Sequence, residues 1–303
     1  MPQHFLMCPP THFTVSYQIN PWMNAKVATD ADRAVRQWQV LRDTYLDLGH
    51  TVDVIDPLPQ YPDMVFAANG ATVIDGIAYS AKFRHNERAG EAPAYLDWLV
   101  AAGFTPVHAT ETNEGEGDLL HVGGMILAGT GFRTSTAAHH EAQEVFGLPV
   151  VSLQLVDPHF YHLDTALTVL REDLIAYYPP AFSTGSQRVL ARLFPDAIVA
   201  TEADAGALGL NAVSDGTHVV HAPAATNLAA QIRERGLEPI AVDTSELLKG
   251  GGGAKCCTLI LRAADDDEAR AAAHVTSRQL APGGTGNGTD RGPVPGTRTH
   301  PAH

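Results

Sequence analysis

The sequence is poor in cysteine and in basic residues, and it contains no long hydrophobic run. Three cysteines in 303 residues are too few for a disulfide framework, so a reducing compartment is expected. The 20 Lys and Arg are outnumbered by 34 Asp and Glu, and the net charge of −14 disfavours nucleic acid and anionic membrane surfaces as partners. No apolar window approaches the roughly 18 residues of a membrane-spanning helix.

The first residues also lack the features of a secretory signal. The segment MPQHFLMCPPTHF has no basic start, and Pro9 and Pro10 interrupt its apolar stretch. A cytoplasmic protein is therefore expected. A hydrophobic content of 45% with 18% charged residues is typical of a folded globular chain.

A unit made of a β-hairpin, an amphipathic helix and one further strand recurs along the chain. Its hairpins begin near residues 71, 118, 165, 211 and 257, and two of them contain an Asp-Gly turn. The fifth copy, CCTLILR, has only its first strand. The N-terminal segments HFLMCP, residues 28–49 and HTVDVIDP supply the missing strand, helix and strand.

The repeat predicts an α/β fold in which five ββαβ units form a closed ring, with the fifth unit built from both termini. Residues 1–265 would then form a single catalytic domain. Residues 266–303 are predicted to form a short Ala-rich helix followed by a disordered tail, because Gly, Pro, Thr and Arg dominate after Leu280.

In such a ring, the loops that precede the first strand of each unit meet at one end of the axis. These loops carry a thiol, an imidazole, carboxylates and amides: Asp63, Asn69, Glu114, Glu116, Asp118, His162, Asp164, Asn211 and Cys256. The sequence therefore predicts a reactive site at that end.

Cys256 is the candidate nucleophile of this site. It follows Gly250 to Gly253, a segment that lets a ligand approach the main chain, whereas Cys257 points to the other face of its strand. A buried structural thiol is the alternative for any cysteine. Lys255 and a nearby imidazolium are expected to lower the pKa of Cys256. The spacing fits neither a Walker phosphate loop nor a tetrahedral zinc site.

His162 is the candidate acid and base, and it lies at the position of the repeat that Cys256 occupies in the fifth unit. If its segment is extended, His162 and Asp164 point in the same direction.

Together these motifs resemble the guanidine-modifying branch of the pentein superfamily. This branch includes arginine deiminase, dimethylarginine dimethylaminohydrolase, amidinotransferases and arginine dihydrolases. GGGGAKCCT resembles its nucleophile loop, YHLDT its histidine motif and NEGEGD its acidic motif, and the resemblance covers about residues 4–262. It implies a hydrolase with Cys256 as nucleophile and His162 as acid and base, without metal or organic cofactor.

The resemblance also implies roles for further residues. Glu114 is expected to orient His162, with Glu116 as the alternative, because EGEGD is one residue longer than the usual EGGD. Arg133, in GFRTS, would pair with the substrate α-carboxylate, with Arg84 and Arg88 as alternatives. The guanidine group would be bound by Asp63, Asp164, Asn69 and Asn20.

Two departures favour the dihydrolase type within this branch. DMVFAANG has Ala68 and Asn69 where deiminases and dimethylaminohydrolases commonly place carboxylates, and the opening segment with Asn20 is similar to that of arginine dihydrolases. An amide both donates and accepts hydrogen bonds, so it can retain a neutral ureido intermediate for a second attack. The expected reaction converts arginine to ornithine, ammonia and carbon dioxide through a covalent Cys thiouronium.

Several alternatives stay open at this point. Dimethylarginine dimethylaminohydrolase or arginine deiminase activity would give citrulline, an amidinotransferase would use the same covalent intermediate, and a non-catalytic pentein would bind a partner. The expected partner is a small molecule, arginine or an N-methylated arginine, and a homodimer is left open.

Overall fold

Five three-stranded sheets organise the part of the chain that the computed structural model describes, residues 2–264. Contacts divide the chain into residues 1–264 and 265–303. The predicted Ala-rich helix and the disordered tail lie outside the described residues.

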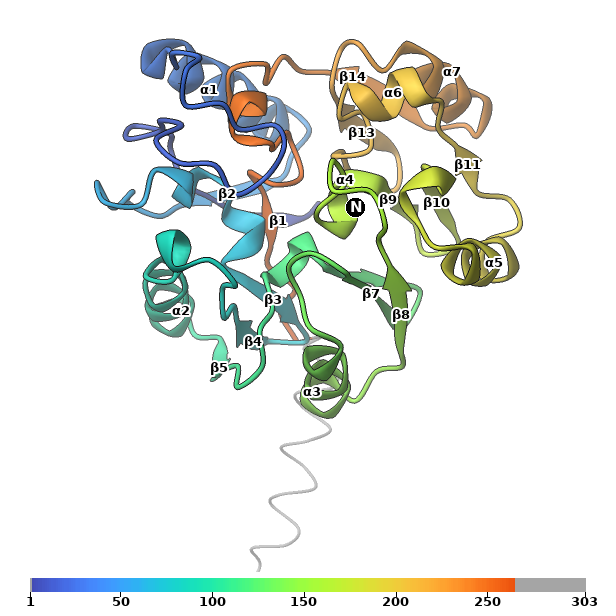
Figure 1. Ribbon diagram of the computed structural model, residues 1–303, viewed down its shortest axis with the longest axis horizontal. Helices are drawn as coiled ribbons and strands as arrows, with labels where there is room; N and C mark the ends of the chain where they lie inside the picture. The colour runs from blue at the N-terminus through green and yellow to red at the C-terminus, as the bar shows by residue number, and fades with distance from the viewer. Residues whose placement is uncertain (1, 265–303) are drawn as a thin grey trace, which may run out of the picture. The chain divides into compact units, whose positions relative to one another are not determined.

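Every sheet has the same construction. Two antiparallel strands form its hairpin side, and the third strand pairs in parallel with the second. A parallel third strand requires a crossover, which a helix supplies in each unit. The structure therefore confirms an α/β fold of repeated ββαβ units. In Figure 1 helices α1, α2, α3, α5 and α7 lie toward the outside of the view and the strands toward its middle.

The first two units follow one another along the chain. The first contains β3 (Ala71–Ile74), β4 (Ile77–Ser80), α2 (Glu91–Ala101) and β5 (Thr105–Val107). The second contains β6 (Leu119–Val122), β7 (Met125–Thr130), α3 (Thr136–Phe146) and β8 (Val150–Gln154).

The third and fourth units repeat this order. The third contains β9 (Leu167–Arg171), β10 (Leu174–Tyr177), α5 (Thr184–Leu193) and β11 (Ile198–Val199). After α6 (Glu202–Gly206), the fourth contains β12 (Val213–Ser214), β13 (His218–His221), α7 (Thr226–Glu234) and β14 (Glu238–Ala241).

The remaining sheet combines strands from the two ends of the described chain. Strand β15 (Leu259–Ile260) pairs antiparallel with β1 (His4–Met7), and β1 pairs in parallel with β2 (Thr51–Val54). Helix α1 (Ala31–Asp47) connects β1 to β2.

Local sequence explains where these elements begin and end. Asp75 and Gly76 have φ angles of 49° and 75°, as a two-residue turn between β3 and β4 requires. The side chain of Asp30 caps α1 by accepting from Arg33 N, and α1 buries an apolar stripe of Ala34, Trp38, Leu41 and Tyr45.

Short helices occupy the loops that precede the first strands. These are η1 (Pro62–Val65), η2 (Ala67–Asn69), η4 (Gly115–Gly117) and α4 (Leu163–Ala166); η6 (Leu247–Gly250) leads into the nucleophile loop, while η3 (Asn86–Arg88) and η5 (Pro179–Ala181) lie elsewhere. The expectation of an extended segment from His162 to Asp164 is wrong, because α4 begins directly after His162. The two side chains therefore serve different partners.

The hydrophobic core lies between the sheets and their helices. Its largest cluster joins the second, third and fourth units through residues such as Leu127, Leu167, Ile175 and Ile232. None of the helices within residues 2–264 is long and apolar enough to cross a membrane.

Candidate active site

The loops before the first strands meet, as the repeat predicted. Ala68 N donates to Cys256 O at 3.0 Å, and Asn69 Nδ2 donates to Glu114 O at 3.3 Å. These two bonds join loops of the first, second and fifth units. The site is therefore assembled from segments nearly 190 residues apart in sequence.

Cys256 is held by Asn211, which precedes β12. Asn211 Oδ1 accepts from Gly253 N at 2.9 Å and from Cys256 N at 3.0 Å, and Asn211 Nδ2 donates to Cys256 Sγ at 3.0 Å. One amide thus fixes both the backbone and the sulfur of the nucleophile loop. Gly251 has a φ of 92°, a conformation that favours glycine within this loop.

The thiol of Cys256 faces Asp164. Cys256 Sγ donates to Asp164 Oδ2 at 3.3 Å, and both residues are buried. Burial raises the pKa of Cys256 well above its ordinary value, and the carboxylate of Asp164 raises it further. Burial likewise raises the pKa of Asp164, to about 7.

Lys255 does not act on the thiol as expected from the sequence. Its Nζ donates to Glu116 Oε2 at 2.9 Å, so its charge is paired with a buried carboxylate. The expectation that Lys255 lowers the pKa of Cys256 is wrong because burial and Asp164 dominate.

His162 forms a buried chain with Glu114 and Arg133. His162 Nε2 lies 2.7 Å from Glu114 Oε2, and Arg133 Nη1 donates to the same oxygen at 2.7 Å. Burial alone would raise the pKa of Glu114, but the Arg133 guanidinium and His162 outweigh it and hold that pKa well below its usual range. Glu114 is therefore a fixed negative charge against the imidazole.

Glu116, the alternative partner of His162, lies in a different cluster. Its carboxylate binds Lys255, Arg262 and Ile260 N. The structure thus places Glu114, and not Glu116, against His162.

Three polar atoms of this region are buried without a hydrogen-bond partner among residues 2–264. They are His162 Nδ1, Asp63 Oδ1 and Asp164 Oδ1. Buried polar atoms are normally paired, and an unpaired one calls for an explanation. Two carboxylate oxygens and one imidazole nitrogen would suit a ligand rich in N–H groups.

Asp63 is further held by Tyr17, whose hydroxyl donates to Asp63 Oδ2 at 2.9 Å. Burial raises the pKa of Asp63, while Arg88 opposes this shift. Asn69 accepts from Arg88 Nη1 at 2.7 Å through its Oδ1.

Asn20 contacts the glycine-rich loop. Asn20 Nδ2 donates to Gly250 O at 3.0 Å, and the hydroxyl of Tyr161 donates to Gly251 O at 3.0 Å. A Cβ atom at Gly251 would lie 2.9 Å from both Asn20 and Tyr161. The loop therefore has no room for a side chain there.

The three arginines considered for the α-carboxylate have different environments. Arg133 is buried, with Nη1 on Glu114 and Nη2 donating to Ile19 O at 2.9 Å. Arg88 is buried against Glu91. The side chain of Arg84 is exposed, while its backbone N donates to Glu114 Oε1 at 3.2 Å.

Some of these contacts were missed in the sequence. Asn211 was seen as a loop residue but not as the partner of Cys256, and Tyr17 and Tyr161 gave no signal. Asp118 was noted in the acidic motif, where it accepts from Leu163 N at 3.0 Å and from Thr134 Oγ1 at 2.7 Å. The position of Asn211 in the repeat was the one available clue.

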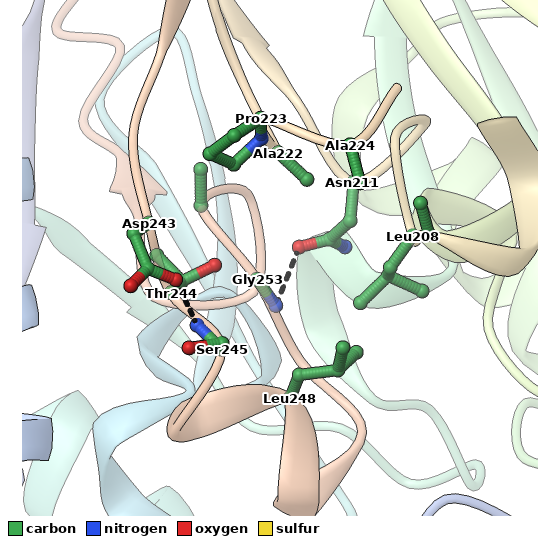
Figure 2. Close-up of a pocket in the computed structure, with 12 residues that line it drawn as sticks. Leu208, Asn211, Ala222, Pro223, Ala224, Asp243, Thr244, Ser245, Leu248 and Gly253 are labelled. Carbon is green, nitrogen blue, oxygen red and sulfur yellow. Dashed lines mark hydrogen bonds between the residues drawn. The ribbon is translucent and has the colours of Figure 1, made fainter. Parts of the chain in front are cut away.

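A pocket of about 450 Å³ lies behind the nucleophile loop (Figure 2). Asn211 and Gly253 line it, joined by the hydrogen bond drawn in the figure. Most other lining residues are small or apolar, including Leu208, Pro223 and Leu248. The pocket thus borders the amide that holds Cys256. No group of three His, Cys, Asp or Glu in residues 2–264 is arranged to hold a metal ion.

Comparisons with known proteins show the family of this chain. The family model described as N,N dimethylarginine dimethylhydrolase, eukaryotic, matches residues 1–262. The N(G),N(G)-dimethylarginine dimethylaminohydrolase of Mycobacterium tuberculosis is 57% identical over 248 residues, covering 82% of each chain. The bifunctional arginine dihydrolase/ornithine cyclodeaminase ArgZ of Synechocystis sp. is 36% identical over 80% of this chain, which spans 36% of that protein.

Solved structures show the same fold. The N-terminal domain of ArgZ, an arginine dihydrolase from the ornithine-ammonia cycle in cyanobacteria, superposes with a TM-score of 0.83 at 35% identity, covering 86% of this chain and 98% of that domain. It was solved as a Cys-to-Ser variant bound to substrate, and also as an Asn-to-Ser variant covalently bound to a reaction intermediate. A dimethylarginine dimethylaminohydrolase structure, 20% identical with a TM-score of 0.70, supports the fold. From its fold and from these relatives, the chain belongs to the dimethylarginine dimethylhydrolase family of guanidine-modifying pentein enzymes.

Proposed function

We propose that this protein is an arginine dihydrolase, which hydrolyses both terminal C–N bonds of the arginine guanidine group. Arginine and two waters give ornithine, two ammonias and carbon dioxide. The substrate lies between Asp63 and Asp164, whose unpartnered oxygens accept guanidinium N–H groups.

Cys256 attacks the guanidinium carbon in the first step. Its thiol is protonated in the free enzyme, because burial and Asp164 raise its pKa. A bound guanidinium supplies the positive charge that favours the thiolate, since an opposite charge nearby stabilises an ionised group. The Cys256 thiol proton passes to His162 Nδ1 as the S–C bond forms, and His162 returns it to the departing nitrogen, which leaves as ammonia and gives a covalent thiouronium.

His162 then acts as a base toward water. Glu114 accepts from Nε2–H, so the unpartnered Nδ1 faces the reacting atoms as the acceptor. Water adds to the thiouronium carbon and the S–C bond breaks, leaving a ureido group. A second round forms an S-carbamoyl adduct with loss of ammonia, and its hydrolysis leaves a carbamate that releases carbon dioxide.

The observation that carries the dihydrolase proposal is the buried amide of Asn69 beside the His162 loop. Asn69 Nδ2 points toward Glu114 O, and a Cβ at Gly117 would lie 2.3 Å from Asn69 Nδ2 and 3.2 Å from His162 Nδ1. A carboxylate here would repel a ureido oxygen, whereas an amide N–H donates to it. In ArgZ, replacing an asparagine by serine gave a structure with a covalently bound intermediate, which supports a role for an amide in such chemistry.

Arg133 and Arg84 are proposed to bind the α-carboxylate. Arg133 uses two of its five N–H donors on Glu114 and Ile19, and Arg84 is an exposed cation whose backbone touches Glu114. Asn20, which contacts the glycine-rich loop, is proposed to bind the guanidine end of the substrate.

Dimethylarginine hydrolysis to citrulline and dimethylamine is the second candidate. The 57% identity to a relative that bears this name favours it. The same Cys256, His162 and Glu114 would serve, with a single hydrolytic round.

One experiment separates the two functions. The protein is incubated with L-arginine and, separately, with N,N-dimethyl-L-arginine, and ornithine, citrulline, ammonia and dimethylamine are quantified. Ornithine and two equivalents of ammonia from arginine are expected. Citrulline as the sole end product would overturn the dihydrolase proposal. Cys256→Ser should abolish turnover and Cys257→Ser should preserve it; the reverse would move the nucleophile to Cys257.

We also propose that the five units close into a ring. Hydrogen bonds between successive units support this, and they join the pairs Asn69 and Glu114, Asp118 and Leu163, Thr168 and Ala212, Asn211 and Cys256, and Cys256 and Ala68. The three cysteines are free, which supports the proposed cytoplasmic location.

A further inference from the structure

A closed circuit of hydrogen bonds connects the loops that carry Glu114 and His162. Glu114 N donates to Thr134 Oγ1 at 3.2 Å, and Thr134 Oγ1 donates to Asp118 Oδ2 at 2.7 Å. Asp118 Oδ1 accepts from Leu163 N, directly after His162, at 3.0 Å. The contact of 2.7 Å between His162 Nε2 and Glu114 Oε2 completes the circuit. The acid and base pair is therefore connected twice, once through its side chains and once through its loops.

The hydroxyl of Thr134 accepts and donates at once, which its two neighbours in the circuit do not. A backbone N–H only donates and an ionised carboxylate only accepts, so a hydroxyl placed between them satisfies both. Thr134 and Asp118 are 3% and 1% exposed, and water therefore competes little for these contacts. A side chain of the same shape without the hydroxyl would break the circuit at both bonds.

Asp118 carries the circuit from the second unit to the third. It precedes β6, whereas Leu163 is the first residue of α4. Asp118 O accepts from Gly129 N at 2.8 Å, and a Cβ at Gly129 would lie 2.6 Å from Asp118 Oδ1 and 2.8 Å from Leu163 Cβ. The carboxylate and the start of α4 thus pack tightly against β7. The place of His162, the residue before α4, is thereby tied to the unit that carries its partner.

The main chain at Thr134 is held independently of its hydroxyl. Thr134 O accepts from Thr130 Oγ1 at 2.7 Å, and Ser135 N donates to Thr112 O at 2.9 Å. Loss of the hydroxyl is therefore expected to leave the backbone of this segment, and with it Arg133, in place.

We infer that Thr134 is a positioning residue that acts through Asp118 to hold His162 against Glu114. The inference rests on the proposed function in one respect, that His162 serves as acid and base. A misplacement of about 1 Å at reacting groups costs about 100-fold in rate, so a link between these two loops acts on kcat rather than on substrate binding.

The test compares Thr134→Val, which keeps the shape and loses the hydroxyl, with Thr134→Ser, which keeps the hydroxyl. The kcat is measured at pH 8 with L-arginine or N,N-dimethyl-L-arginine, whichever the wild type converts, and the Kd of the same substrate is measured in a Cys256→Ser background. This pH lies above the pKa of Asp118, which burial raises to about 6. The kcat of Thr134→Val should fall about 10- to 100-fold with Kd unchanged, and Thr134→Ser should retain most of the wild-type kcat.

A second measurement does not require turnover. The His162 N–H that faces Glu114 is followed as a downfield resonance in proton NMR, assigned by its absence in His162→Asn. A buried, hydrogen-bonded proton exchanges slowly with water, so the resonance should stay sharp in the wild type and in Thr134→Ser and broaden or vanish in Thr134→Val. If the wild type hydrolysed neither substrate, the proposed function would fail and this comparison would still test the inference.

Thr201→Val is the matched control. The hydroxyl of Thr201 also donates to a carboxylate oxygen, that of Asp204, and accepts from a backbone N–H, that of Asp204, but it caps α6. Its loss should lower the unfolding temperature and leave both kcat and the resonance unchanged. An equal loss of kcat in Thr201→Val would mean that reduced stability explains the effect, and the inference would fall.

Three further outcomes would overturn the inference. Unchanged kcat and resonance in Thr134→Val would make the circuit purely structural. The same losses in Thr134→Ser would mean that the hydroxyl is not the group that matters. A rise in Kd as large as the fall in kcat would assign Thr134 to substrate binding through Arg133.

A variant of the carboxylate replaces Thr134→Val if that protein does not fold. Asp118→Asn keeps one acceptor and turns the other into a donor, so it satisfies either Leu163 N or the Thr134 hydroxyl but not both. The same loss of kcat and of the resonance is expected, and wild-type values for both in folded Asp118→Asn would refute the inference.

Discussion

His162 Nε2 lies 2.7 Å from Glu114 Oε2, and Nδ1 of the same ring is buried without a partner among the described residues. A carboxylate accepts hydrogen bonds only, so Nε2 carries the proton that joins the pair. In the neutral imidazole the lone pair then lies on Nδ1. This one contact therefore fixes both the orientation of the proposed base and the ring nitrogen that carries its proton.

Glu114→Gln should lower kcat by about 10²- to 10³-fold, the range typical for loss of a general acid and base. The glutamine leaves Arg133 without its carboxylate and can present N–H to His162, which disfavours the Nδ1 lone pair. Steady-state ammonia release measures the effect.

Glu116→Gln is the matched comparison. It breaks a buried cluster with Lys255 and Arg262, so a loss of about 3 kcal/mol in unfolding free energy is expected, with most of kcat retained in the folded protein. If Glu116→Gln removed activity and Glu114→Gln did not, the assignment of the histidine partner would be wrong.

Gly117→Ala should disable the site while preserving the fold. Its Cβ would lie 2.3 Å from Asn69 Nδ2 and 3.2 Å from His162 Nδ1, so both side chains must shift. A displacement of about 1 Å at reacting groups lowers kcat by about 100-fold. Gly206→Ala, whose Cβ meets nothing within 4 Å, is the control. Full activity of Gly117→Ala would contradict the arrangement.

Asn211→Asp tests the support of the nucleophile loop. The aspartate keeps an acceptor for Gly253 N and Cys256 N, but it loses the donor to Cys256 Sγ and adds negative charge beside the sulfur. The pKa of Cys256 should rise further, because a like charge disfavours a thiolate. Alkylation of Cys256 by iodoacetamide should slow about tenfold at pH 8. An unchanged rate would mean that Asn211 does not influence the thiol.

Stability should fall as pH rises through the titration of Asp164. Burial raises the pKa of this carboxyl from 3.8 to about 7, so the fold favours its protonated form. Protonated Asp164 adds about 4 kcal/mol to the free energy of unfolding for a pKa shift of this size. This contribution is complete below about pH 4 and is lost between pH 4 and 7. Asp164→Asn does not titrate.

Urea unfolding at pH 5 and pH 8 checks this prediction. The unfolding free energy of the wild type, relative to Asp164→Asn, should be higher at pH 5 than at pH 8. A difference that does not change with pH would show that Asp164 titrates normally.

The repeat could be predicted because its signals are local. Turn residues such as Asp75 and Gly76 and the apolar stripe of α1 depend on neighbours only a few positions away, and the structure begins β3, β6, β9, β12 and β15 within two residues of the expected starts. Because the spacing of the hairpins is constant, it also predicted the unit that combines β15 with β1, α1 and β2.

The details of the site depend on contacts across units, which no local pattern encodes. Helix α4 was missed because it is only four residues long, too short to give a periodic pattern. It is also held by a residue of another unit, since Asn211 Nδ2 donates to the backbone carbonyl of Asp164. The pairing of Lys255 with Glu116 spans 139 positions, and no local pattern predicts it.

The pairing of β15 with β1 has a consequence for synthesis on the ribosome. The strand at residues 259–260 completes the sheet that the first residues began, and Cys256 lies just before it. Four units can form while translation continues, but β1 waits with an open edge until β15 has emerged. Cys256 thus emerges just before the strand that completes this sheet, so a polypeptide that stops before residue 256 lacks the proposed nucleophile.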